Sequence, residues 1–173
     1  MTLKINILME EIMIITGYQG IGKSTLASKN DKIIDLESSS FWKYDKETKQ
    51  KVKHNDWYIY YCQVAQHLSA QGYIVFVSCH QQVRDWLAVH NQEKFCAIFP
   101  SKELKEEWLK RLEDRYNVSQ SEKDLRAWEH AKKNFDNDIY GLWYECQYNV
   151  EYYHNVAIIK DINYDLQELV DKL

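Results

Sequence analysis

Short apolar runs alternate along this chain with longer stretches in which apolar residues recur every three or four positions. The runs predict five strands, MIIT (13–16), KIIDL (32–36), YIVFVS (73–78), KFCAIF (94–99) and VAIIK (156–160). The longer stretches predict helices near 23–29, 56–71, 81–90, 101–116 and 122–149, and a last helix from about 165. The helix over 122–149 is expected to break at residues 136–138 or at Gly141. This alternation is typical of βαβ units, so we predict an α/β fold of three layers, a five-stranded parallel sheet flanked by helices.

The length and composition fit one compact domain. The chain has 173 residues, 45% of them hydrophobic, and a net charge of −4. We expect a single domain over 1–173, with 1–12 as an extension and about 111–149 as a helical lid or insertion. The four cysteines are far apart in the sequence and no apolar leader opens the chain, so we expect a soluble cytoplasmic protein without membrane contact. The negative charge disfavours long nucleic acids as the main ligand without excluding a local basic face.

A glycine-rich segment follows the first predicted strand. It has the spacing of a P-loop, or Walker A motif: Gly17, four residues, then Gly22, Lys23 and Ser24. Glycines let successive backbone N–H groups point into one concavity that suits phosphate. Lys23 is expected to reach the β- and γ-phosphates of ATP, and Ser24 to place its hydroxyl on Mg²⁺. The predicted nucleotide-binding residues are Gly17, Tyr18, Gln19, Gly20, Ile21, Gly22, Lys23, Ser24 and Thr25.

Acidic residues close the second predicted strand. Right-handed crossovers bring the carboxyl ends of parallel strands to the edge where the P-loop lies. Asp35 and Glu37 share one face of this extended segment because side chains alternate. A carboxylate there is suited to accept the proton of an attacking hydroxyl, to orient an acceptor, or to hold Mg²⁺ through water. A solvated loop start is the plain alternative.

Cationic residues follow the third and fourth predicted strands. Arg84, early in the helix after strand three, is placed to grip a phosphate or carboxylate of the acceptor, or else belongs to ordinary surface charge. His80 is better read as a hydrogen-bonded or exposed loop histidine. Arg111 and Arg115 lie one helical turn apart, so they share a face from which to stabilise a transferring phosphoryl group. Pairing with nearby glutamates such as Glu107 is the alternative.

These features together resemble the small P-loop kinases. The motifs are the P-loop, the acidic end of strand two, VSCHQQVRDWL after strand three and LKRLEDR after strand four. They are most similar to the gluconate and shikimate kinase branch beside the nucleoside monophosphate kinases, and the chain also resembles phage-encoded nucleotide kinases. The resemblance implies ATP and Mg²⁺ at Lys23 and Ser24, an acceptor at Asp35 and Arg84, and lid arginines at 111 and 115. The chain departs from these families in lacking a D-x-D on strand two and in its long helical stretch over 122–149.

Aromatic residues near the second predicted helix favour a nucleotide as acceptor. Trp42, Trp57 and Tyr58 lie where monophosphate kinases receive their acceptor, and an aromatic plane there is suited to stack on a base. Other aromatics recur at helical spacing and are expected to pack in the core. These are Tyr58 and Tyr61 with Ala65 in the second helix, and Tyr140, Trp143, Tyr144 and Tyr148 with Gln147 in the fifth.

Three functions remain open from the sequence. The first is an ATP-dependent kinase for a small acceptor, above all a nucleoside or deoxynucleoside monophosphate. The second is a kinase for a nucleic-acid end or a modified base in DNA, for which the basic cluster before the second helix is the candidate groove, with a solvated loop as the alternative. This cluster comprises Lys43, Lys46, Lys49, Lys51, Lys53 and His54. The third is a non-catalytic nucleotide-binding regulator.

Overall fold

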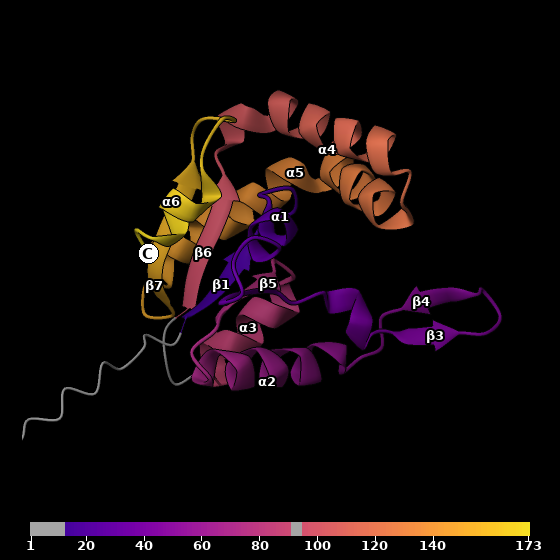
Figure 1. The fold of residues 1–173 in the computed structure, drawn as a ribbon, viewed down its shortest axis with the longest axis horizontal. Coiled ribbons are helices and arrows are strands. Elements are labelled where there is room, and N and C mark those ends of the chain that lie inside the picture. The colour runs from indigo at the N-terminus through magenta and orange to yellow at the C-terminus, as the bar shows by residue number, and fades with distance from the viewer. Residues whose placement is uncertain (1–12, 91–94) are drawn as a thin grey trace, which may run out of the picture.

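The structure is a computed structural model that describes residues 13–90 and 95–173. Its element order is the predicted one except for two further short strands between the second predicted strand and the second predicted helix. Five parallel strands form the main sheet in the order β2-β5-β1-β6-β7 (Figure 1). They are β1 (Met13–Gly17), β2 (Ile33–Asp35), β5 (Ile74–Ser78), β6 (Phe95–Pro100) and β7 (Tyr153–Ile159). The predicted extension 1–12 and the predicted strand start at Lys94 lie outside the described residues. The α/β prediction with a five-stranded parallel sheet is confirmed.

The strand order distributes the helices over both faces of the sheet. The step from β1 to β2 runs in one direction along the sheet, and the later steps from β2 to β5, β6 and β7 run in the other. Right-handed crossovers therefore place α1 (Lys23–Ala27) on one face and α2 (Trp57–Ala70), α3 (Gln81–His90) and α5 (Glu122–Tyr148) on the other. The packing agrees, because α2 contacts β1, β5 and α3, whereas α1 contacts α6 (Leu166–Val170). The connections diverge around β1, and the glycine-rich segment leaves this strand at its carboxyl end.

The helix α5 runs unbroken for 27 residues, so the predicted break at 136–138 or Gly141 is wrong. It forms an antiparallel pair with α4 (Lys105–Ser119), which follows the short 3-10 turn η2 (Lys102–Leu104). One stripe of α5 is buried at three- and four-residue spacing: Ala131, Phe135, Ile139, Leu142 and Cys146. This continuous apolar stripe packs along α4 and β6 and keeps the polar and glycine positions helical.

The prediction of core packing for the aromatic residues of α5 is also wrong. Tyr140 and Tyr148 are each 64% exposed, Trp143 and Tyr144 are largely exposed, and Gln147 is exposed. They lie on the side of α5 away from the buried stripe, and their rings pack on one another along the helix. In α2 the prediction of core packing is confirmed, because Tyr61 and Ala65 are buried. Periodicity alone did not tell which of two apolar faces on α5 meets the core.

Replacing Gly141 by alanine is expected to stabilise the protein. Gly141 lies inside α5 with ordinary helical backbone, and an added Cβ would meet no atom within 4 Å. Alanine in an open helical position is favoured over glycine by about 0.5–1 kcal/mol. Urea unfolding should show this gain. A matched Gly20→Ala variant should lose stability, because Gly20 has φ +88° and its Cβ would lie 2.9 Å from Cδ2 of Leu112. A loss on Gly141→Ala would contradict an unbroken α5.

Two arms project beyond the carboxyl edge of the sheet (Figure 1). One is the α4–α5 helical pair. The other comprises the 3-10 turn η1 (Ser38–Phe41) and an antiparallel hairpin of β3 (Lys43–Asp45) and β4 (Gln50–Val52). Lys43, Lys46, Lys49 and Lys51 of the basic cluster lie in this hairpin, and Lys53 and His54 directly follow it. No helix in the described part of the chain is long and apolar enough to cross a membrane.

Candidate functional site

A cleft of about 1280 Å³ opens between the two arms at the carboxyl edge of the sheet. Its floor is the loop between β1 and α1, and its walls come from the end of β2 through Trp42, from the start of α3, and from α4 and α5. The predicted site residues that border it are Gly17 to Thr25, Asp35, Glu37, Arg84, Arg111 and Arg115. The fold therefore gathers residues from four separate segments, as the parallel sheet predicts.

The loop at the floor has the backbone of an anion nest. Gly20 and Gly22 adopt left-handed φ values of +88° and +97°, which side chains with a Cβ rarely adopt. At Gly17 a Cβ would lie 2.7 Å from Cδ1 of Ile21, so the loop closes tightly on itself. In the described part of the chain, no protein acceptor takes up the amide N–H groups of Gly22, Lys23 and Ser24. These free donors at the cleft are suited to an anionic ligand.

Hydrogen bonds from neighbouring elements hold the loop in this shape. The indole Nε1 of Trp108 donates to the carbonyl of Gln19 at 2.9 Å, and Nε2 of Gln19 donates to the carbonyl of Ala127 at 3.0 Å. The hydroxyl of Tyr164 donates to the carbonyl of Ile21 at 2.7 Å. These bonds tie the loop to the α4–α5 pair through Trp108 in the first turn of α4 and Ala127 in the second turn of α5.

Two of the predicted nucleotide-binding residues face the protein instead of the cleft. Tyr18 and Ile21 are almost fully buried. Tyr18 packs edge-to-face on Phe135, and its hydroxyl donates to Asp138 Oδ2 at 3.2 Å. Burial, with the Asp138 carboxylate beside it, raises the pKa of the Tyr18 hydroxyl, which stays protonated. At these positions only the backbone is available to a ligand.

The side chain of Lys23 folds back over the loop. Its Nζ donates to the carbonyl of Gly17 at 2.6 Å and lies 3.4 Å from that of Tyr18. Burial lowers the pKa of Lys23, although Asp35 favours the charged form. The two carbonyls offer only partial negative charge, so a phosphate at the nest would be a stronger partner for this ammonium group.

Ser24 and Asp35 form a pair beside Lys23. The Ser24 hydroxyl donates to Oδ2 of Asp35 at 2.5 Å. No cluster of three potential metal-ligating side chains exists among the described residues. The donor set nevertheless fits Mg²⁺, which commonly binds through one or two protein oxygens plus substrate phosphates and water. Ser24 would hold the ion, with Asp35 as a direct or water-mediated partner.

Glu37 links the two arms across the cleft mouth. Its carboxylate forms an ion pair with Lys123 at the start of α5, and its Oε1 accepts the backbone N–H of Ser39 at 3.2 Å. Desolvation raises the pKa of Glu37, but Lys123 and the Ser39 N–H outweigh it, so the pKa lies below its usual value. A second link joins the same arms, because the Arg126 guanidinium lies 5.9 Å from the ring centre of Trp42.

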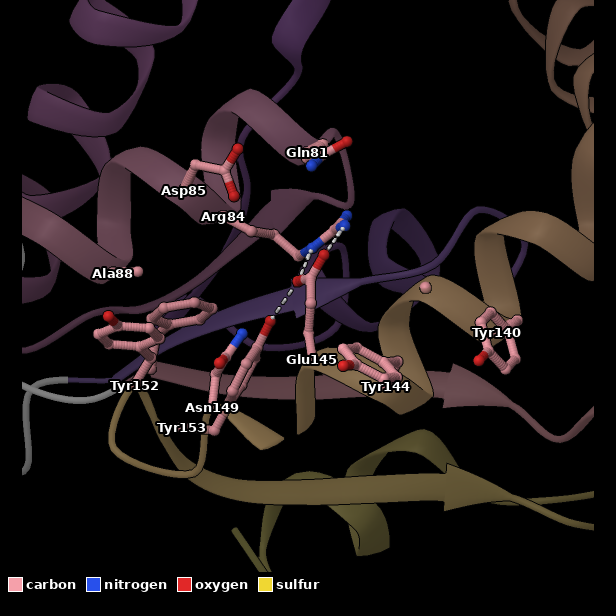
Figure 2. Close-up of a pocket in the computed structure, with 12 residues that line it drawn as sticks. Gln81, Arg84, Asp85, Ala88, Tyr140, Tyr144, Glu145, Asn149, Tyr152 and Tyr153 are labelled. Carbon is pink, nitrogen blue, oxygen red and sulfur yellow. Dashed lines mark hydrogen bonds and ion pairs between the residues drawn. The ribbon is translucent and has the colours of Figure 1, made fainter. Parts of the chain in front are cut away.

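Arg84 forms a buried ion pair and is not free to bind an anionic ligand. Figure 2 shows its guanidinium against the carboxylate of Glu145, with Nε and Nη2 each 2.7 Å from one oxygen. Nη1 donates to the carbonyl of Cys79, and the Tyr153 hydroxyl donates to the same Glu145 carboxylate. The predicted role in acceptor binding would require this pair to open, so the guanidinium serves first to join α3 to α5.

The two predicted lid arginines border the cleft with partners that the sequence did not suggest. The Cζ atom of Arg111 lies 5.3 Å from the Trp108 ring and 5.2 Å from the Tyr164 ring, and Nη1 donates to the carbonyl of Ile162. Arg115 pairs with Asp124 at 2.7 Å, and its buried Nε has no acceptor in the protein. Neither arginine pairs with Glu107, so the alternative of glutamate pairing along α4 is wrong.

Trp57 cannot stack on a ligand as predicted, because its side chain is 1% exposed. Its ring packs against Trp42, Tyr61 and His80. Trp42 is only half-buried and borders the cleft, so it is the aromatic residue within reach of an acceptor. Sequence reasoning missed Lys123 and Arg126, whose positions depend on how the two arms face each other, and it named Lys53 only as a member of the basic cluster.

His80 is a neutral histidine at the cleft wall. Its Nδ1 lies 2.8 Å from Oγ of Ser78, which confirms the reading of a hydrogen-bonded loop histidine. Burial, together with the positive charges of Lys53, His130, Lys23 and Arg84, lowers the pKa of His80 to about 3.

This environment predicts that the stability of the folded protein decreases as the pH is lowered below 6.5. The pKa of His80 in the folded state lies below its unfolded value of 6.5. As the pH drops below 6.5, the unfolded chain therefore binds a proton at His80 that the folded protein does not bind. Between pH 7.5 and 5.0 this should remove about 1–2 kcal/mol of stability from the wild type. Urea unfolding at both pH values should show a smaller loss for His80→Gln, in which position 80 does not titrate. Equal losses in the two proteins would mean that His80 is protonated in the folded state.

Comparison with known proteins adds no relative. No protein-family model matches the chain, and no curated protein matches it significantly.

Proposed function

We propose that this protein is a P-loop kinase that transfers the γ-phosphoryl group of ATP to a small acceptor held in the cleft. A nucleoside or deoxynucleoside monophosphate is the acceptor class we propose first. The observation that supports this most directly is the glycine-built loop, whose amide N–H groups at Gly22, Lys23 and Ser24 have no protein acceptor. The Lys23 ammonium and the Ser24–Asp35 pair lie beside these donors. The parallel sheet fits a P-loop nucleotide-binding fold, and the resemblance to small P-loop kinases points the same way.

In this reaction an oxygen of the acceptor forms a bond to the γ-phosphorus. The bond from that phosphorus to the β–γ bridging oxygen breaks, and ADP leaves with its electron pair. Lys23 would balance negative charge on the phosphate oxygens, and the nest amides would fix their position. Mg²⁺ bound at Ser24 would add charge neutralisation on the same oxygens. Arg111 and Arg115 lie on the α4 wall, from which they would close on the phosphoryl group.

The acceptor would enter from the side of the cleft opposite α4. The volume of about 1280 Å³ exceeds that of most single-ligand pockets, so it leaves room for two ligands. Trp42 borders this side with Lys53 held 5.2 Å from its ring centre. A flat aromatic ring flanked by a cation is suited to a nucleotide, because the base stacks and the phosphate pairs.

A screen for ADP release tests the proposal. The protein is incubated with ATP and Mg²⁺ alone, then with nucleoside monophosphates, sugar acids or shikimate. We expect ADP release that depends on one acceptor class and phosphorylated product in equal amount. Tight ATP binding without acceptor-dependent ADP release would favour a nucleotide-binding regulator instead. Failure to bind ATP would remove the kinase proposal.

Asp35→Asn is expected to separate two roles of this carboxylate. If Asp35 contacts the acceptor, turnover should fall at least tenfold while ATP affinity stays within about twofold. If Asp35 supports Mg²⁺ through Ser24, the Mg²⁺ concentration needed for half-maximal turnover should rise. The short bond to Ser24 leads us to expect the second pattern. Titration of Mg²⁺ at saturating ATP measures it, and an unchanged Mg²⁺ dependence would assign Asp35 to the acceptor.

A further inference from the structure

The hairpin of β3 and β4 projects from the protein without packing on it. All its strand residues are exposed except Asp45, which is half-buried, and Tyr44 is 62% exposed. An isolated two-stranded hairpin is at most marginally stable in water. A contribution to the stability of the fold therefore does not explain why the protein has this arm. Its exposed surface is therefore available to a partner.

The hairpin carries positive charge that the protein leaves unpaired. Lys43, Lys46, Lys49, Lys51 and Lys53 lie within eleven residues. None of them forms an ion pair with the described residues, whereas Lys105, Lys110, Lys123 and Lys172 elsewhere do. The same segment holds two acidic residues, Asp45 and Glu47, and the Asp45 carboxylate accepts the backbone N–H groups of Glu47 and Thr48 at the turn. Such a surface is complementary to a polyanion.

One face of the hairpin continues the acceptor side of the cleft. Tyr44 lies directly opposite Lys51 in the strand pairing, so these two share a face. Alternation along the extended backbone adds Trp42 and Lys53 to that face, and the 5.2 Å contact between them agrees. Trp42 and Lys53 border the cleft, and Tyr44 and Lys51 come next toward the tip. Aromatic rings alternating with lysines are suited to a single strand, whose bases stack and whose phosphates pair.

The opposite wall also presents basic side chains. Lys123, Arg126, His130 and Lys133 all border the cleft and follow one another at spacings of three or four residues on α5. They therefore form one helical stripe that faces the hairpin side. Lys123, Arg126 and His130 have acidic partners in Glu37, Glu122 and Asp138. Among the described residues, Lys133 and the hairpin lysines form no ion pair, so they are the unneutralised part of this surface.

We propose that the hairpin guides a single-stranded nucleic acid whose terminal nucleotide enters the cleft, so that the acceptor is the hydroxyl at a strand end. This rests on the proposed kinase function and puts the end of a strand in place of the free mononucleotide as its acceptor. The terminal hydroxyl oxygen forms the bond to the γ-phosphorus and loses its proton to solvent water. The bond from that phosphorus to the β–γ bridging oxygen breaks, and ADP leaves with its electron pair. The net charge of −4 disfavours long nucleic acids as the main ligand, but the lysines of this segment give one arm a local positive charge.

The test measures binding and transfer separately. Fluorescence anisotropy follows 12-nucleotide single strands, labelled internally, with the full chain free of ATP. The hairpin variant is Lys46→Ala/Lys49→Ala/Lys51→Ala. The matched control, Lys102→Ala/Lys160→Ala/Lys172→Ala, removes the same charge from exposed lysines outside both arms. Circular dichroism verifies that both variants fold.

We expect the hairpin variant to bind at least tenfold more weakly at 50 mM salt, and the control to stay within twofold of wild type. The slope of log affinity against log salt should become shallower by about 2, because three phosphate contacts are lost. Tyr44→Ala should weaken binding about fivefold or more. Equal losses in the hairpin and control variants, or no binding by wild type, would overturn the proposal.

Transfer is then measured with wild type, ATP and Mg²⁺. DNA and RNA strands are offered with either a 5′-hydroxyl or a 5′-phosphate, and the labelled phosphate is located by digestion. Label at a strand end supports the proposal and shows which end and sugar are preferred. Transfer to mononucleotides but to no strand overturns this inference and leaves the kinase proposal standing. No ADP release with any acceptor removes the kinase proposal, while the anisotropy result still decides whether the hairpin binds a strand.

Discussion

Replacing Lys23 by alanine is expected to lower ATP-dependent phosphoryl transfer at least a hundredfold while the protein stays folded. The Nζ atom lies at the nest, 2.6 Å from the carbonyl of Gly17, where a phosphate would take its place as partner. Removing one well-placed donor to a developing negative charge commonly costs about 3–4 kcal/mol in the barrier. Initial rates of ADP release under saturating ATP, Mg²⁺ and acceptor give the measurement.

Stability separates this effect from misfolding. Burial lowers the pKa of Lys23, so its charge is disfavoured in the folded protein, and the alanine variant should unfold at an equal or higher temperature. Lys29→Ala is the matched control, because Lys29 is an exposed lysine shortly after α1 and does not border the cleft. It should keep wild-type rates. Near-normal turnover in Lys23→Ala would contradict the kinase proposal.

Replacing Arg84 by methionine is expected to destabilise the fold by about 2–4 kcal/mol. The side chains of Arg84 and Glu145 are 9% and 21% exposed, so the variant leaves the Glu145 carboxylate poorly solvated without its partner. The carbonyl of Cys79 also loses its donor. Urea unfolding at pH 7.5 measures the loss of stability. The helices α3 and α5 should separate first, because the Arg84–Glu145 ion pair joins them (Figure 2).

A double-mutant cycle identifies the cause. Arg84→Met/Glu145→Gln should lose clearly less stability than the sum of the two single variants, because no unpaired charge remains. Lys105→Met serves as the comparison, since Lys105 forms its ion pair with Asp136 on a more exposed part of the surface and should change stability by at most about 1 kcal/mol. If Arg84→Met leaves stability unchanged and instead raises the KM for the acceptor, the role predicted from the sequence is restored.

The sequence by itself determined the order of the main-sheet strands and the helices, and the position of the nest, but not the hairpin of β3 and β4. The apolar runs locate all five strands of the main sheet because a parallel sheet buries both faces of each strand. The P-loop spacing locates the turn because two of its positions, Gly20 and Gly22, require a left-handed backbone. Asp35 could be placed near Ser24 because parallel strands end at one edge.

Only the tertiary structure decided what each cleft residue contacts. The sequence predicted that Arg84 binds the acceptor, but α5 places Glu145 against its guanidinium. Glu145 lies 61 positions further along the chain. Trp57 looked available for stacking, yet Trp42 covers it. The exposed aromatic stripe of α5 has the same spacing as a buried one, and the packing of α4 and β6 on the other stripe decides which meets water. Periodicity and motif spacing are local properties, whereas burial and ion pairing depend on segments that meet only after folding.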